Sequence, residues 1–168
     1  HTYTPVIRRE VRQLEPTNKG HYTVYLPAYA DEILLAVLGQ FKEARWEVFS
    51  KHSKTATQVG NVCIRPVDNE GFIRSMTESE GVLCGAGFET PAEALFLGKK
   101  LLVIPMKNQY EQHCNAAGAA YLGVPVIEDF SAENVGILRD WLQYGRPISV
   151  NYPDETEAIL AKVLATRL

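Results

Sequence analysis

The stretch GAGFETPAEALFLGKKLLVIP, residues Gly85–Pro105, contains a helix start that decides how the chain folds. Thr90 has the residue type of an N-cap, Pro91 fits the first helical position, and Glu93 completes a capping box three residues after the cap. The apolar run EGVLC before it, Glu80–Cys84, predicts a strand. The stretch is therefore predicted to be a strand, a glycine-containing link and a helix.

The link between strand and helix, Gly85–Glu89, is predicted to bind an anion. A helix N-terminus presents unpaired N–H groups and the positive end of the helix dipole. Those N–H groups lie near Phe88–Thr90, and Gly85 and Gly87 remove the side chains that would block an approaching phosphate. The two glycines are explained equally well as turn residues, so the pattern alone leaves both interpretations open.

The composition is typical of one soluble globular domain. The chain has 168 residues, of which 46% are hydrophobic and 22% are charged, and its formal net charge is -3. Because there is no basic excess, nucleic acid is not an expected partner. The apolar runs are shorter than the ~20 residues of a membrane helix, so no transmembrane segment is predicted.

The cysteines indicate a reducing compartment. Cys63, Cys84 and Cys114 form no CxxC pair, and their odd number does not fit a closed disulfide framework. The sequence around each of them predicts an apolar setting. We therefore expect a cytoplasmic protein.

Apolar β-rich runs alternate with segments of helical period from His21 onward. The predicted strands are His21–Pro27, Arg45–Ser50, Asn61–Pro66, Glu80–Cys84, Lys100–Pro105 and Val124–Glu128. The predicted helices are Asp31–Ala44, Asn69–Ser79, Thr90–Leu97, Gln109–Leu122 and Ser131–Tyr144. Because this alternation pairs strands in parallel and covers both sheet faces, we expect a doubly wound, Rossmann-like α/β fold with about six strands.

Three segments fall outside this alternation. Residues 1–20 are predicted to be a strap or linker from a missing amino-terminal domain, with the basic cluster Ile7–Glu10 solvated, and residues 21–168 are predicted to form the α/β domain. Lys51–Gly60 is polar and unperiodic, which predicts a surface loop. Asp154–Leu168 is predicted to be a terminal amphipathic helix.

A longer segment starting at Gly85, GAGFETPAEALFLGKKLLVIPMKNQYEQHCNA, resembles the signature of the carboxy-terminal half of GT-B glycosyltransferases. That superfamily includes the UDP-glycosyltransferases and the peptidoglycan N-acetylglucosaminyltransferase. The resemblance is clear over Cys84–Gly123 and weak over His21–Phe130. The positions that agree with the family pattern are Gly87, Phe88, Thr90, Glu93, Glu111, Gln112 and Asn115.

The resemblance implies that parts of this segment bind a nucleoside diphosphate sugar. The residues expected to hold the diphosphate are Gly85, Gly87, Phe88, Glu89 and Thr90. The residue expected to accept from the ribose hydroxyls is Glu93, and those expected beside the base are Pro66 and Val67. The residues expected to contact the sugar are Glu111, Gln112 and Asn115.

The resemblance also implies a function for the whole protein. We expect the donor-binding domain of a glycosyltransferase that moves a sugar from a nucleoside diphosphate, with UDP as the expected one, to an unknown acceptor. An amino-terminal domain in the same chain or in a partner subunit would hold the acceptor and supply the general base, so no catalytic residue is assigned here. No cofactor and no metal ion are expected.

The chain opens at His1 rather than at methionine, which indicates a removed start site or a piece cut from a longer protein. In the second case this fragment alone is expected to be inactive, and the missing domain leaves room for peripheral membrane contact.

Two positions depart from the family pattern. Gly85 stands where many relatives have histidine, so the backbone has to supply more of the phosphate contacts. Glu89 stands where Asn, Gly or Ser is usual. Its carboxylate would repel a diphosphate unless the side chain turns away or a cation intervenes.

Several of these residues also have ordinary structural explanations. Glu93 can serve as the capping-box partner of Thr90. Phe88 is expected to pack in the core rather than to stack on a ligand. Gln112 and Asn115 fall on a predicted helix, where polar side chains usually face water.

Three other functions stay open at this point. The chain could be a natural donor subunit that borrows its acceptor half from a partner, a non-catalytic nucleotide-binding module, or half of a nucleotide-sugar epimerase. The sequence contains neither a GxGxxG motif with a distant acidic residue nor GxxxxGK[ST], which argues against dinucleotide and ATPase sites.

Overall fold

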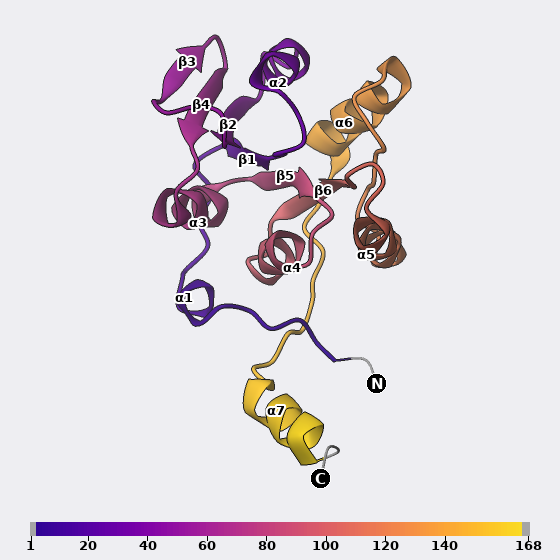
Figure 1. The fold of residues 1–168 in the computed structure, drawn as a ribbon. Helices are drawn as coiled ribbons and strands as arrows, with labels where there is room; N and C mark the ends of the chain where they lie inside the picture. The colour runs from indigo at the N-terminus through magenta and orange to yellow at the C-terminus, as the bar shows by residue number, and fades with distance from the viewer. Residues whose placement is uncertain (1–2, 166–168) are drawn as a thin grey trace.

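The computed structural model describes residues 3–165, and it shows a mostly parallel sheet with helices on both faces (Figure 1). The strands are β1 (His21–Tyr25), β2 (Arg45–Ser50), β3 (Thr57–Val59), β4 (Val62–Pro66), β5 (Gly81–Gly85) and β6 (Lys100–Ile104). The helices are α1 (Arg9–Arg12), α2 (Asp31–Leu38), α3 (Asn69–Glu78), α4 (Glu89–Phe96), α5 (Tyr110–Tyr121), α6 (Ala132–Tyr144) and α7 (Thr156–Ala165).

The strand order in the sheet is β3-β4-β2-β1-β5-β6. Starting from β1, the chain adds β2 and β4 in parallel on one side and then returns to add β5 and β6 in parallel on the other side. The order therefore reverses between β1 and β5, which is where open α/β sheets leave a crevice at the carboxyl ends of the strands. The predicted doubly wound α/β fold is confirmed.

The core consists of two clusters, one on each face of the sheet. Side chains from α1, α3, α4 and α5 pack on one face, and side chains from α2 and α6 pack on the other. Successive strand residues alternate between the clusters: Val82 and Cys84 face α3 and α4, whereas Leu83 between them faces α2 and α6. Burial on both faces explains why these strands are apolar almost without interruption.

The predicted surface loop Lys51–Gly60 is wrong in its second half, because Thr57–Val59 form β3 and pair antiparallel with β4. Gly60 has a φ of 57°, and with Asn61 it makes the two-residue connection between the strands. A Gly-Asn pair is typical of such hairpin turns. Because all three residues of β3 are exposed and only Val59 is apolar, no apolar run marks this strand in the sequence.

The predicted strand Val124–Glu128 is also wrong, because this segment makes only one isolated bridge to β6, between Val103 and Val126. Two backbone hydrogen bonds hold it, from Val103 N to Pro125 O and from Ile127 N to Val103 O. Pro125 has no N–H to extend the ladder. The sheet has six strands as expected, but the sixth is β3.

Helix α2 ends at Leu38, six residues before the predicted end at Ala44. The side-chain amide of Asn61 donates hydrogen bonds to the carbonyls of Phe41 at 2.7 Å and Ala44 at 2.8 Å. These bonds satisfy carbonyl groups in the turn after the helix. A residue from the β3–β4 connection thus stabilises the turn that follows α2.

Residues 3–20, called the strap below, pack against the α/β domain. The predicted solvation of Ile7–Glu10 is wrong for Ile7, which is buried, and for Arg8, which is half-buried, whereas Arg9 and Glu10 are exposed as predicted. Ile7 and Val11 are 3% and 0% exposed and belong to the core cluster under α3 and α4. The buried ammonium group of Lys99 donates to Thr17 O at 2.6 Å and to Ser79 O at 2.8 Å. The strap is therefore an ordered part of this fold.

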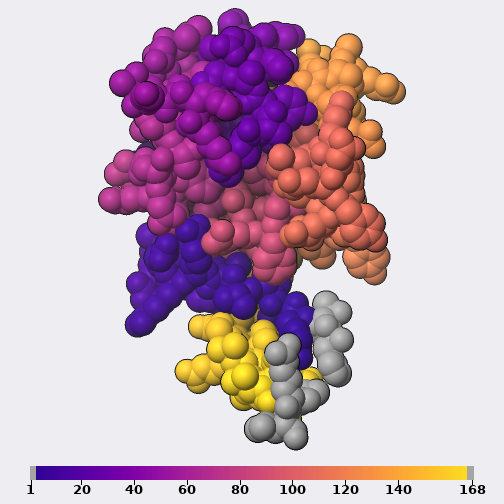
Figure 2. All heavy atoms as spheres, viewed as in Figure 1, coloured from indigo at the N-terminus to yellow at the C-terminus, as the bar shows by residue number. Residues whose placement is uncertain are grey.

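The terminal helix is confirmed over Thr156–Ala165, and residues 166–168 lie outside the described part. It buries none of its residues and projects from the body of the molecule beside the start of the strap (Figures 1 and 2). Thr4 Oγ1 donates to Glu155 Oε2 at 2.9 Å just before this helix. Across residues 3–165, none of the helices combines the length and apolar character needed to cross a membrane.

The three cysteines are free, and one of them is not in the predicted apolar setting. Cys84 is buried, which raises the pKa of its thiol, and Cys63 is half-buried. Cys114 is exposed on α5, because its position in the helix faces away from the sheet.

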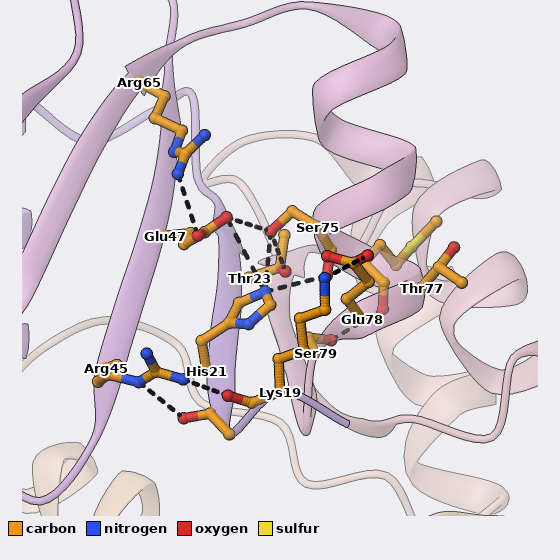
Figure 3. Close-up of polar contacts among 12 residues, drawn as sticks. Lys19, His21, Thr23, Arg45, Glu47, Arg65, Ser75, Thr77, Glu78 and Ser79 are labelled. Atoms are coloured by element: carbon orange, nitrogen blue, oxygen red, sulfur yellow. Dashed lines mark hydrogen bonds and ion pairs between the residues drawn. The ribbon is translucent and has the colours of Figure 1, made fainter. Parts of the chain in front are cut away.

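A polar network lies at the amino end of β1 (Figure 3). Its members His21, Thr23 and Ser75 are buried, whereas Glu47 and Arg65 are partly exposed. His21 Nε2 is 3.1 Å from Ser75 O and from Ser75 Oγ, and Thr23 Oγ1 is 2.7 Å from Ser75 Oγ. Ser75 Oγ also donates to Glu47 Oε2 at 2.8 Å, and Arg65 pairs with Glu47 Oε1 at 3.2 Å. Burial lowers the pKa of His21, because the imidazolium form loses its hydration.

This network predicts that the protein loses stability as the pH falls. The folded pKa of His21 is below its unfolded value of about 6.5, so the unfolded chain binds more protons below that pH. We expect the free energy of unfolding to decrease between about pH 7 and pH 5, and to decrease less in His21→Gln. Urea unfolding at several pH values measures both slopes. Equal slopes in the two proteins would contradict a lowered pKa of His21 in the folded protein.

Candidate functional site

A cavity of about 440 Å³ lies where the strand order reverses. The segments after β1, β5 and β6 form its walls at the carboxyl edge of the sheet. The lining residues that matter most for its chemistry are Tyr25, Tyr29, Gly85, Gly87, Thr90 and Gln112. Its volume lies in the range of about 300 to 1,000 Å³ that small-molecule sites occupy.

Helix α4 points its N-terminus toward this edge, but it begins differently from the prediction. The helix starts at Glu89 with Phe88 before it, and no side chain caps it. Thr90 is therefore the second helical residue rather than the N-cap, and Pro91 is the third. No capping side chain accepts a hydrogen bond from the N–H groups of this first turn, so these groups are available to bind an anion.

The side chains of Phe88 and Glu89 both lie at the surface. Phe88 is 57% exposed, so its predicted packing in the core is wrong; the apolar face of the helix begins only at Pro91. Glu89 turns toward Arg8 of the strap, and the distance between its Oε1 and Arg8 Nε is 3.1 Å. A cation thus stands beside the carboxylate that would otherwise repel an anion.

The glycines at this junction are not required by the backbone conformation. Neither Gly85 nor Gly87 is among the residues with positive φ. A Cβ atom on Gly87 would meet no other atom within 4 Å, and one on Gly85 would lie at an ordinary 3.5 Å from Gln112 Oε1. If Gly85 and Gly87 only formed a turn, the structure would give no reason for glycine at these positions. Close approach of a ligand to the backbone would give one.

Gln112 and Asn115 do not simply face water as polar helix residues usually do. Gln112 Oε1 accepts from Met106 N at 2.9 Å, and Asn115 Nδ2 donates to Ala86 O at 3.1 Å. Both side chains on α5 thereby hold backbone of the links after β5 and β6. Glu111, the neighbouring position of the predicted sugar site, is exposed.

Glu93 is engaged by the strap and not by the start of its own helix. Arg8 donates from Nε to Glu93 Oε1 and from Nη2 to Glu93 Oε2, both at 2.7 Å, and the Glu93 side chain is 1% exposed. The predicted capping box is thus wrong. Glu93 does not line the cavity, nor do Pro66 and Val67, and their expected contacts to ribose and base stay predictions.

Three further residues of the site escaped the sequence analysis. Lys107 and Asp129 line the cavity, and their side chains are 3.6 Å apart. The backbone N–H of Ser131 and the side-chain amide of Asn134 lower the pKa of Asp129 to about 2. The position of Lys107 directly after a buried strand was the available signal. No local sequence signal pointed to Arg8, because its partner Glu93 is 85 positions away in the chain.

The arrangement is suited to holding an anion by backbone groups and the helix dipole. Gly87 and Thr90 stand at the cavity wall where α4 begins, and the ion pair of Lys107 and Asp129 lines the cavity as well. Among residues 3–165 there is no group of three or more histidine, cysteine or acidic side chains that could bind a metal ion.

Residues 1–142 match the family model described as glycosyl transferase family 1. A comparison with curated protein sequences gave no match.

Solved structures of similar fold were also found. They include MurG of Acinetobacter baumannii (18% identity, TM-score 0.54, 80% of this chain and 43% of that one) and SnogD from Streptomyces nogalater (16%, 0.53, 97% and 47%). The glycosyltransferase VinC, solved with dTDP, is similar at 16% identity and a TM-score of 0.53, over 83% of this chain and 37% of that one. The chain therefore spans less than half the length of these structures, and its fold is one Rossmann-like half of the GT-B fold.

The contacts of α5 predict a difference in stability between two neighbouring substitutions. Asn115→Ala removes the hydrogen bond to Ala86 O and leaves the carbonyl of this buried residue with one partner fewer, which should cost about 1 kcal/mol. Glu111→Ala changes an exposed position of the same helix and should stay within about 0.5 kcal/mol. Urea unfolding measures both. Equal effects would mean that Asn115 does not hold the link.

Proposed function

The chain belongs to glycosyl transferase family 1, and on this basis we propose that it is the donor-binding part of a glycosyltransferase. It would bind a nucleoside diphosphate sugar, with UDP as the first nucleotide to test, and present the sugar to an acceptor. The acceptor would be held by an amino-terminal domain of the same protein or by a partner subunit, as expected if this chain supplies one half of a two-domain enzyme.

The observation that carries this proposal is the cavity at the reversal of strand order. Its wall contains the uncapped start of α4 and the glycine at position 87, whose missing side chain leaves the backbone accessible. A diphosphate placed there would accept from first-turn N–H groups and lie at the positive end of the helix dipole. Gly85, Phe88, Glu89 and Thr90 complete the proposed diphosphate site.

The rest of the donor would extend in two directions from the diphosphate. The nucleoside would run toward the carboxyl end of β4, with Pro66 and Val67 beside the base and Glu93 near the ribose. The sugar would extend toward the start of α5, where Glu111, Gln112 and Asn115 are the proposed contacts. Gln112 lines the cavity, which supports this direction for the sugar.

The chemistry proposed for this half is stabilisation of the leaving group. When the glycosidic bond to the sugar breaks, negative charge builds up on the diphosphate, and donors that are already in place stabilise it without reorganisation. Lys107 also lines the cavity, but it is paired with the ionised Asp129 at 3.6 Å, so the pair adds no net charge and Lys107 would contact the diphosphate only by turning away from Asp129. Asp129, with a pKa of about 2, is a weak base at neutral pH. The general base for the acceptor hydroxyl is therefore proposed to come from the other half.

The proposal predicts that UDP stabilises the folded chain. At a ligand concentration 100 times the dissociation constant, linkage gives about 2.7 kcal/mol, which raises the melting temperature by several degrees. Calorimetry with UDP and dTDP, and with adenosine monophosphate as a control, measures the affinity directly. If neither diphosphate produces heat or raises the melting temperature at millimolar concentration, donor binding is wrong. If dTDP binds more tightly than UDP, only the choice of nucleotide changes.

The glycine at position 87 gives a second prediction. Gly87→Ala adds a methyl group that meets no protein atom within 4 Å, so the melting temperature should stay nearly the same. The methyl group would obstruct the diphosphate, so we expect the affinity for UDP to fall about tenfold, or ~1.4 kcal/mol. Gly118→Ala is the matched control, since its methyl group also meets no atom and lies on α5 away from the cavity lining. Equal UDP affinities for both variants would refute close approach at position 87.

A further inference from the structure

We propose that Arg8 of the strap is the counter-charge that allows the first turn of α4 to hold a diphosphate. This inference rests on the proposed donor function and adds a positioning residue from outside the segment that resembles the family. Arg8 would hold the Glu89 carboxylate away from the ligand and offset its negative charge.

The guanidinium group of Arg8 lies between the starts of two helices. Its Nε and Nη2 donate to the two oxygens of Glu93 on α4, both at 2.7 Å, and its Nη1 donates to Asn69 Oδ1 at 2.8 Å. Glu89, the first residue of α4, is 3.1 Å from Nε. Asn69 is the first residue of α3, which follows the strand whose end is the proposed base site.

The electrostatics of α4 make such a cation necessary for an anionic ligand. Two carboxylates, Glu89 and Glu93, stand in the first two turns of the helix, and a third, Glu10, is 3.6 Å from Arg8 Nη1. Carboxylates at a helix N-terminus occupy the field that would otherwise attract a phosphate. None of Arg8, Glu89 and Glu93 lines the cavity, so their charges would act on the diphosphate from beside the start of α4, where we expect one unit charge to alter the affinity by about tenfold.

Arg8 is held in this place by contacts other than its own ion pairs. The side chains of Ile7 and Val11 on either side of it are buried, and the ammonium group of Lys99 binds the strap further along at Thr17 O. Arg12, one turn later, donates to Tyr152 O at 2.9 Å. Replacing Arg8 should therefore remove its charge while the strap stays in position.

A purely structural role for Arg8 would consist of pairing the buried Glu93 carboxylate. Loss of that pairing would loosen α3 and α4 together and weaken the binding of a nucleoside and of its diphosphate alike. Loss of a counter-charge would weaken only the diphosphate. The ratio of the affinities for UDP and uridine therefore distinguishes the two roles.

The test is calorimetric binding of UDP and of uridine to the whole chain and to Arg8→Gln and Arg8→Gln/Glu89→Gln, with folding checked by circular dichroism. We expect Arg8→Gln to bind UDP about tenfold more weakly and uridine within twofold of the unaltered chain. Adding Glu89→Gln should recover most of the UDP affinity. Arg9→Gln is the matched control, because it removes a positive charge at an exposed position next to Arg8, and it should leave both affinities within twofold.

If circular dichroism shows that Arg8→Gln does not fold because Glu93 is left buried without a cation, Glu93→Gln is compared with Arg8→Gln/Glu93→Gln. These two proteins differ only in the Arg8 charge, and the same tenfold difference for UDP is expected. An unchanged ratio of UDP to uridine affinity in either comparison overturns the role of Arg8 and leaves donor binding intact. If the unaltered chain binds no UDP, the donor function fails first and this inference fails with it.

Discussion

The reversal of strand order between β1 and β5 is the constraint on which the rest of the molecule depends. Because the chain builds the sheet outward from β1 in two directions, the segments after β1 and β5 turn apart and leave a cavity at the carboxyl edge. The same topology directs the N-terminus of α4 to that edge. A helix end whose N–H groups have no capping side chain is stable there only because it can be solvated or occupied by an anion.

Polar groups at the amino ends of the strands differ in their partners from those at the carboxyl ends. At the amino end, the side chains of His21, Ser75, Glu47 and Arg65 bond to one another (Figure 3). At the carboxyl end, backbone groups beside Gly87 stay accessible. The polar side chains at the amino end are thus paired with one another, and the carboxyl end is where we propose that a ligand binds.

The strap joins these parts into one unit. It contributes Ile7 and Val11 to the core, accepts the ammonium group of Lys99, and places Arg8 against the starts of α3 and α4. Through Arg8 the strap would therefore also set the charge beside the proposed diphosphate site. Any movement of the strap would change that charge directly.

The sequence by itself determined the doubly wound fold and most helix and strand positions, and it indicated the junction after β5, where a cavity lies. These follow from period, propensity and short motifs, which act between residues close in the chain. The tertiary structure alone decided that Glu93 pairs with Arg8 instead of capping its helix, that Asn61 stabilises the turn after α2, and that Phe88 is exposed. Each depends on a partner or a neighbouring surface distant in sequence, and no local pattern records which distant groups folding brings together.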